Sequence, residues 1–220
     1  MTVMDTTSFV QELDRFKAES LSPIIGAGQT SLLSGAPVDA KKMLQVALAN
    51  EISVSELAAV WMPSTQEVDV KIALARQAGD EAGHFQLVAD RLAILGFDIA
   101  SFQAPRANPL FDYLRGLSTT VERLAAGLFT LESIAYGVNE NFVAFCHQRG
   151  DAETVRIYRE FIQPDEQRHQ QLGRQLLAKY ATESALHQKA KQAVGRVLEI
   201  ATAARVQAAE QMGTACFPGC

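Results

Sequence analysis

The chain has 220 residues, 48% of them hydrophobic, and a formal net charge of −5 at neutral pH. This length suits one domain over residues 1–220, and the acidic balance without a Lys/Arg-rich run leaves no basic surface for a nucleic acid. The first residues lack the plan of a signal peptide, no apolar stretch reaches the length of a membrane span, and three cysteines are too few for a disulfide framework. A soluble cytoplasmic protein without a membrane partner is therefore expected.

The composition predicts helices almost throughout, since Ala, Leu, Gln, Glu and Arg dominate long stretches and runs of Val, Ile and Thr are scarce. A short amphipathic helix is expected from Ser8 to Ala18, followed by a Gly-, Ser- and Pro-rich connection from Ser22 to Pro37. The main bundle then begins with a helix from about Asp39 to Trp61, which Pro63 ends. The run Ser64-Thr65-Gln66-Glu67 has capping-box spacing and predicts the start of the next helix.

The second helix of the bundle is expected to end near Gly96. The segment from Phe97 to Asn108 contains Pro105, and its length predicts a crossover connection rather than a tight turn. A third helix is then expected from about Pro109 to Gln148.

The next turn is marked by Gly150, which suits a C-terminal cap, and by Asp151, which suits an N-cap. A fourth helix is expected from about Ala152 to Tyr180, with Pro164 as a kink inside it. One more helix is expected from Ser184 to Met212.

The chain is expected to end in a frayed tail from Gly213 to Cys220. The predicted fold is all-α: a four-helix bundle over about residues 39–180 with one crossover connection, a short N-terminal helix, and a C-terminal helix over about residues 184–212.

Two segments repeat one pattern, Asp80-Glu81-Ala82-Gly83-His84 and Asp165-Glu166-Gln167-Arg168-His169. Each contains Glu-x-x-His on a predicted helix. Residues three apart project from the same face of a helix, so one carboxylate and one imidazole can reach a single metal ion. Each motif therefore supplies half of a candidate metal site.

The other half is predicted at Glu51 and Glu132. Glu51 shares its helix face with Leu44 and Leu48, and Glu132 lies close to Phe129 in the sequence. A carboxylate on such an apolar face is costly unless it binds something. The apolar flanks therefore disfavour the alternative in which these acids are ordinary solvated surface residues.

The register of the helices supports one common site. Two antiparallel helices place residues at the same height when the residues are equidistant from the turn between them. The midpoint of Glu51 and Glu81 is residue 66, and the midpoint of Glu132 and Glu166 is residue 149, both beside a predicted turn. The predicted metal ligands are Glu51, Glu81, His84, Glu132, Glu166 and His169.

The order Glu51, Glu81-x-x-His84, Glu132, Glu166-x-x-His169 resembles the ferritin-like di-iron carboxylate superfamily over about residues 40–180. The Asp-Glu-x-Arg-His form of the second motif resembles bacterial multicomponent monooxygenases, and Asp-Glu-x-Gly-His is similar to the phenylacetyl-CoA epoxidase group. The resemblance implies two iron ions per chain and reaction of the reduced centre with dioxygen. It also implies that Asp80 and Asp165 accept hydrogen bonds from the ligand imidazoles, with Arg168 beside them.

Several departures narrow the resemblance. The chain is far shorter than a multicomponent hydroxylase subunit. Val88 and Gly173 stand where ribonucleotide reductase small subunits carry a radical tyrosine, and Cys216 with Cys220 cannot supply the four-cysteine iron site of a rubrerythrin.

Three functions remain open from the sequence. The first is a di-iron oxidase or monooxygenase that uses dioxygen, a small organic substrate and an electron-donor protein, with Tyr136 one turn beyond Glu132 as a candidate proton donor. The second is a ferroxidase or peroxide-scavenging protein without an organic substrate, and the third is a metal-free structural bundle. The ligand types accept manganese as well as iron, and a homodimer is expected.

Overall fold

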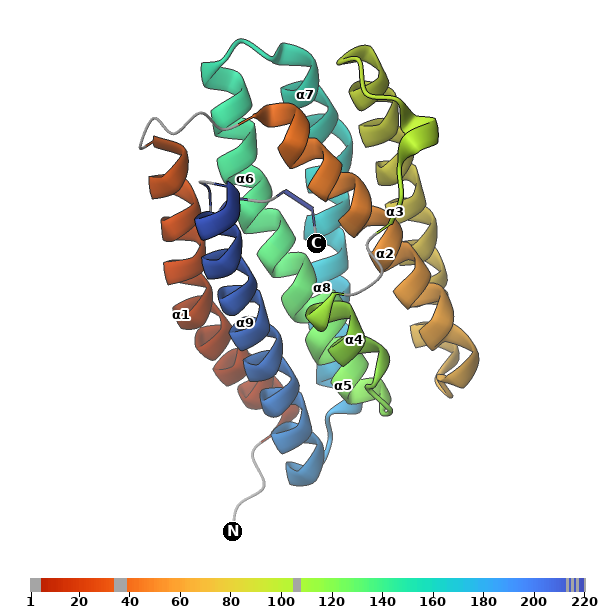
Figure 1. The fold of residues 1–220 in the computed structure, drawn as a ribbon. Helices are drawn as coiled ribbons and strands as arrows, with labels where there is room; N and C mark the ends of the chain where they lie inside the picture. Colours follow the sequence, from red (N-terminus) through yellow and green to blue (C-terminus); the bar gives the residue numbers. More distant parts are fainter. Residues whose placement is uncertain are drawn as a thin grey trace.

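The computed structural model describes residues 5–33, 39–104, 108–212, 214, 216, 218 and 219. These residues form helices joined by turns, with no strand among them, so the all-α prediction is confirmed. Figure 1 shows three pairs of long helices side by side: α1 (Thr6–Leu33) with α9 (Ser184–Met212), α6 (Glu132–Gln148) with α8 (Gln163–Tyr180), and α2 (Ala40–Ser64) with α3 (Val68–Ile94).

The N-terminal helix is much longer than the sequence suggests. The prediction of a short helix followed by a connection from Ser22 to Pro37 is wrong for the described part, because α1 continues to residue 33 with Pro23 inside it. Ile24 is buried in the core, and Asn141 Nδ2 donates to the backbone carbonyl of Ile25 at 2.9 Å. Tertiary contacts thus keep the backbone helical where the local sequence favours a turn. Residues 34–37 of the predicted connection lie outside the described residues.

The turn between α2 and α3 is capped differently from the prediction. The first of these helices runs through Pro63 and ends at residue 64 instead of stopping at Trp61. The predicted capping box from Ser64 to Glu67 is wrong, since Glu67 precedes α3 without a side-chain capping bond. The Glu67 carboxylate instead accepts a hydrogen bond from the Thr120 hydroxyl at 2.6 Å. A tertiary partner has replaced the local one.

The predicted third helix is divided. After α3, a short 3-10 turn, η1 (Ile99–Ser101), lies in the connection, and Pro105 falls outside the described residues. The expected continuous helix from Pro109 to Gln148 is wrong, because the chain breaks between α4 (Pro109–Arg115) and α5 (Thr120–Leu124). Thr119 and Glu122 form a reciprocal capping box that begins α5. The Thr-x-x-Glu spacing of this capping box is present in the sequence, so the start of α5 could have been predicted from it.

The later turns follow the prediction. Gly150 has a positive φ of 72°, as a helix C-terminal cap requires, and the Asp151 side chain accepts from the Thr154 amide at 3.0 Å. The chain then forms α7 (Ala152–Ile157) and enters the returning helix of the central pair.

Two π-helical segments interrupt the central pair. One, η2 (Ala125–Leu131), leads from α5 into α6, and the other, η3 (Tyr158–Ile162), leads from α7 into α8, whose second residue is Pro164. Two side-chain hydroxyls donate hydrogen bonds to backbone carbonyls of the first segment. Thr130 Oγ1 donates to the Ala125 carbonyl at 2.7 Å, and Ser133 Oγ donates to the Phe129 carbonyl at 2.7 Å. Glu132 follows η2 directly, so the wider turns set the rotation of this acid.

The described residues of the C-terminal tail are buried, so the prediction of fraying is wrong for them. The Gly219 amide donates to Asn139 Oδ1 at 2.8 Å, and a Cβ on Gly219 would lie only 3.2 Å from Glu51 Oε1. The tail therefore packs against α2 at the level of Glu51. Its buried residues are Thr214, Cys216, Pro218 and Gly219.

By length and composition, one of the described helices, α2, could cross a membrane, although the sequence predicts no such segment. Half of its apolar window is buried inside the protein, and it carries the fully buried Glu51. The buried core helix of a helical bundle passes the same test of length and composition, so this finding is weak evidence for a membrane span.

Candidate metal centre

The six side chains predicted as metal ligands lie together between four helices. All six are at most 2% exposed. Their ligand atoms form two groups, and within each group these atoms lie within 4.8 Å of one another. The first group is Glu51, Glu81, His84 and Glu166; the second is Glu81, Glu132, Glu166 and His169. Two carboxylates are thus common to both groups, which is the arrangement needed to hold two ions side by side.

Both imidazoles direct Nδ1 into the cluster. The Nδ1 atom of His84 lies 3.3 Å from Glu81 Oε2 and 3.5 Å from Glu51 Oε2. The Nδ1 atom of His169 lies 3.3 Å from Glu81 Oε1 and 3.7 Å from Glu132 Oε2. Glu81 therefore lies between the two imidazoles, one carboxylate oxygen facing each.

The outward nitrogens meet the aspartates of the two motifs crosswise. His84 Nε2 lies 3.2 Å from Asp165 Oδ2, and His169 Nε2 lies 3.0 Å from Asp80 Oδ2. Arg168 joins the two aspartates, with Nη2 2.6 Å from Asp165 Oδ1 and 3.3 Å from Asp80 Oδ2. A carboxylate at Nε2 favours a proton on that atom and leaves the Nδ1 lone pair facing the cluster.

The charges of the cluster are unbalanced without a cation. Burial raises the pKa of Glu51 to about 8, and burial together with the negative charges of Glu132 and Glu81 raises the pKa of Glu166 well above its ordinary value. Burial also favours the neutral form of His169, but its contacts with Asp80, Glu132 and Glu81 outweigh burial and raise its pKa to about 12. Burial would raise the pKa of Glu81, but the two nearby imidazoles of His169 and His84 outweigh burial and lower it. The metal-free cluster thus holds protons where cations would otherwise lie.

Several cluster atoms are buried without a hydrogen-bond partner among the described residues. They are both carboxylate oxygens of Glu51, Oε1 of Glu81 and Nδ1 of His169. A buried polar atom left unpaired costs free energy, and these atoms face one another in one layer. Mixed carboxylate and imidazole donors are those that iron and manganese accept, so the residues fit a pair of divalent ions.

The structure adds three polar residues that the sequence did not single out. Gln77 lies one turn before Glu81 and donates from Nε2 to Glu132 Oε1. Asn139 is buried and binds the tail amide of Gly219. Tyr158 is fully buried with no hydrogen-bond partner for its hydroxyl among the described residues.

Tyr158 also lies close enough for electrostatic coupling to the cluster. Its pKa is raised well above the ordinary value, first by burial and then by the negative charge of Glu51. Gln77 could have been found from its spacing to Glu81, but Tyr158 could not, since it begins the π-helical η3, which changes the rotation of the helix before Glu166.

The predicted role of Tyr136 finds no contact in support. This residue is half-buried, and its backbone carbonyl accepts from Gln163 Nε2 at 3.1 Å. Its phenol makes no hydrogen bond with another described residue, so a role as proton donor stays a prediction.

Comparison with known proteins shows a shared fold. No protein-family model matches the chain, and no curated protein matches it. A solved structure from Shewanella denitrificans, described as a domain of unknown function with a heme oxygenase-like fold, superposes with a TM-score of 0.64. The match covers 97% of each chain at 13% sequence identity. At this identity the likeness shows the fold alone: the chain has an all-helical fold of the heme oxygenase-like type.

Proposed function

We propose that this protein is a non-haem di-iron oxidoreductase that uses dioxygen to oxidise or hydroxylate a small organic substrate. The observation that carries the proposal is the pair of overlapping four-residue groups, buried in one layer and sharing Glu81 and Glu166. The order of acids and histidines along the chain supports placing it with the ferritin-like di-iron carboxylate proteins, within the broader helical fold that it shares with its structural neighbour.

Charge balance supports two divalent ions. Four carboxylates carry four negative charges when ionised, and two divalent cations neutralise them while both imidazoles stay neutral as ligands. Glu51 and His84 would hold one ion, Glu132 and His169 the other, with Glu81 and Glu166 available to both. A ferrous pair held in this way supplies electrons for the reduction of dioxygen.

The chain's own residues orient and enclose the site. Asp80 and Asp165 fix the imidazole rings through their Nε2 atoms, and Arg168 links the two aspartates across α3 and α8. Gln77 holds one oxygen of Glu132. The tail residue Gly219, which lies beside Glu51, helps to exclude water from the layer. Ligands held in this way need little rearrangement when a metal binds.

The enclosure of the cluster also favours an alternative, a ferroxidase or peroxide-scavenging protein that needs no organic substrate. All six cluster residues are at most 2% exposed, and the cavities described between α1 and α9 include none of them. Small reactants such as ferrous ions, dioxygen or peroxide need less space than an organic molecule. The two functions differ in whether a substrate changes the fate of the oxidised centre.

The first experiment counts metal ions. Anaerobic loading with ferrous iron should give two ions per chain in the wild type and at most about one in Glu81→Ala and in Glu166→Ala, because each substitution removes a carboxylate common to both groups. The exposed Glu56→Ala on α2 serves as the control and should keep both ions. If Glu81→Ala and Glu166→Ala both retain two ions, the site assignment is wrong.

The second experiment exposes the ferrous protein to oxygen and measures oxygen consumption and product formation with and without candidate organic substrates. An oxygenase should form oxidised substrate in proportion to the oxygen consumed. Complete conversion of iron to the ferric state with no effect of any substrate would support the iron-handling alternative. A protein that binds no metal would be the structural bundle.

A further inference from the structure

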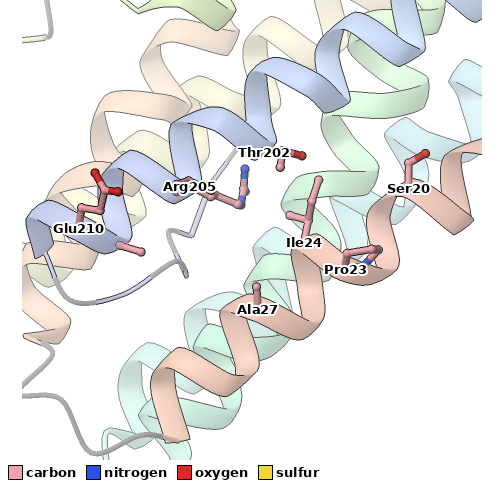
Figure 2. A pocket seen from close by; sticks show the side chains of 9 residues that line it. Ser20, Pro23, Ile24, Ala27, Thr202, Arg205 and Glu210 are labelled. Carbon is pink, nitrogen blue, oxygen red and sulfur yellow. The ribbon is translucent and has the colours of Figure 1, made fainter.

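A groove runs between α1 and α9, outside the metal cluster. Its larger part has a volume of about 780 Å³, and a neighbouring part of about 530 Å³ continues past Ser20 and Thr202, which line both. Figure 2 shows the side chains that face this space from the two helices. Apart from a few polar groups the lining is carbon, with Ile24 and Ala27 on one side and Val206 on the other.

One cation lies in this apolar groove. Arg205 extends from α9 toward α1 (Figure 2), and its Nε atom is enclosed without a hydrogen-bond partner among the described residues. Nη1 donates to the backbone carbonyl of Ala201 at 3.3 Å. Burial lowers the pKa of Arg205 to about 10, so the side chain stays positively charged at neutral pH. A charge held in apolar surroundings without an acidic partner is costly, and an anionic ligand would offset that cost.

The geometry of the guanidinium selects the kind of anion. Nη1 already donates to the Ala201 carbonyl and Nε is enclosed by the protein, so a ligand would meet the guanidinium where Arg205 lines the groove. Two parallel N–H groups match the two oxygens of a carboxylate. Glu210 lies at the rim of the groove, and within the described chain it makes no ion pair with Arg205.

The two hydroxyls of the groove are already engaged as donors. The Ser20 hydroxyl donates to the Phe16 carbonyl at 3.0 Å, and the Thr202 hydroxyl donates to the Leu198 carbonyl at 2.7 Å. A sugar or a nucleotide would need several more polar partners than this groove offers. An unbranched hydrocarbon chain needs none, and because Ser20 and Thr202 line both parts, such a chain can extend from one part into the other.

We propose that the groove binds an unbranched aliphatic carboxylate, with its head beside the guanidinium of Arg205 and its chain along α1 and α9. The site does not depend on the metal cluster, so it stands apart from the oxygen chemistry proposed above. A second copy of this chain is the competing occupant, because Val206 is 57% exposed in the same groove.

The test is the binding of decanoate to the purified protein by isothermal titration calorimetry, below the concentration at which decanoate forms micelles. One decanoate should bind per chain. Decan-1-ol, which has the same chain without the charge, should bind at least about tenfold more weakly. Arg205→Met keeps an apolar stem, and it should weaken decanoate about tenfold or more and abolish the preference over the alcohol.

Two further variants locate the site. Ala27→Phe fills the groove and should weaken decanoate and decan-1-ol alike. Arg196→Met, an exposed position on α9 that lines neither part of the groove, should leave binding unchanged. Each variant is checked for an unchanged urea midpoint and for the same metal content as the wild type, so that a failure of this proposal is separate from a failure of the metal site.

Three results would overturn the proposal: no decanoate binding, equal binding in Arg205→Met, or equal affinity for the acid and the alcohol. Sedimentation would show whether the groove is instead an interface between copies. In that case Val206→Glu would separate a dimer, and neither dimer nor monomer would bind decanoate.

Discussion

In the metal-free state, the stability of this protein should fall as the pH rises from about 5 to about 8. Burial raises the pKa of Glu51 from 4.5 to about 8, so between these values the folded protein keeps a proton that the unfolded chain has lost. Stability then decreases with pH, because the folded state binds more protons. Glu166, His84 and His169 also have raised pKa values and act in the same direction, whereas the lowered pKa of Glu81 acts only below this range.

The shift of Glu51 alone sets the size of the effect. At about 1.4 kcal/mol per pH unit, the free energy of unfolding should fall by about 3 kcal/mol between about pH 5.5 and about pH 8. Glu51→Gln removes this contribution and should make the metal-free protein more stable than the wild type at about pH 8, by about 2 to 3 kcal/mol. Glu56→Gln, at an exposed position of the same helix, should have no such effect.

The assay is urea unfolding followed by circular dichroism, after treatment with a chelator and again with added manganese. Because metal ligands must lose their protons to bind, added manganese should stabilise the wild type more strongly at the higher pH. Glu51→Gln should lose most of that gain. The reasoning is refuted if the metal-free wild type is as stable at about pH 8 as at about pH 5.5, or if Glu51→Gln leaves the pH dependence unchanged.

Three other predictions test the packing around the cluster. Gly173→Ala places a Cβ 2.7 Å from backbone atoms of the facing helix and should lower the free energy of unfolding, measured in urea, by about 2 to 4 kcal/mol. Gly83→Ala, whose Cβ would have nothing within 4 Å, should raise that free energy by up to about 1 kcal/mol. Similar effects of the two substitutions would contradict the close helix contact. Gly219→Leu should displace the tail and speed the removal of bound metal by a chelator about tenfold. Gly96→Ala, at a glycine that also has a positive φ but open space around it, should leave the rate of metal removal unchanged. Equal rates of metal removal in the two variants would show that the tail does not cover the site. Burial lowers the pKa of Lys17 from 10.5 to about 8, so between these pH values the unfolded chain binds more protons than the folded protein. Stability should therefore rise with pH over this range. Lys17→Met should remove the rise, which is measured from the urea midpoints at about pH 8 and about pH 10.

The sequence by itself was sufficient to predict which side chains form the cluster. The spacing of Glu81 and His84 is a property of one helix, and the equal distances of Glu51 and Glu81 from residue 66 are a property of one hairpin. Such local geometry does not depend on the other helices that pack around it, so the six side chains lie together as the register predicts. The all-helical class followed equally from composition, since no stretch favoured a strand.

The tertiary structure decided what local propensity leaves open. Pro23 lies inside a long helix because core contacts outweigh its cost, and Glu67 gives up a local cap for Thr120. The burial of Gly219 beside Glu51 could not be predicted from a tail with no periodicity. The crosswise pairing of each imidazole with the aspartate of the other motif depends on how α3 and α8 face each other. Contacts between segments far apart in the chain have free energies comparable to local preferences, and only the folded arrangement shows which of them prevails.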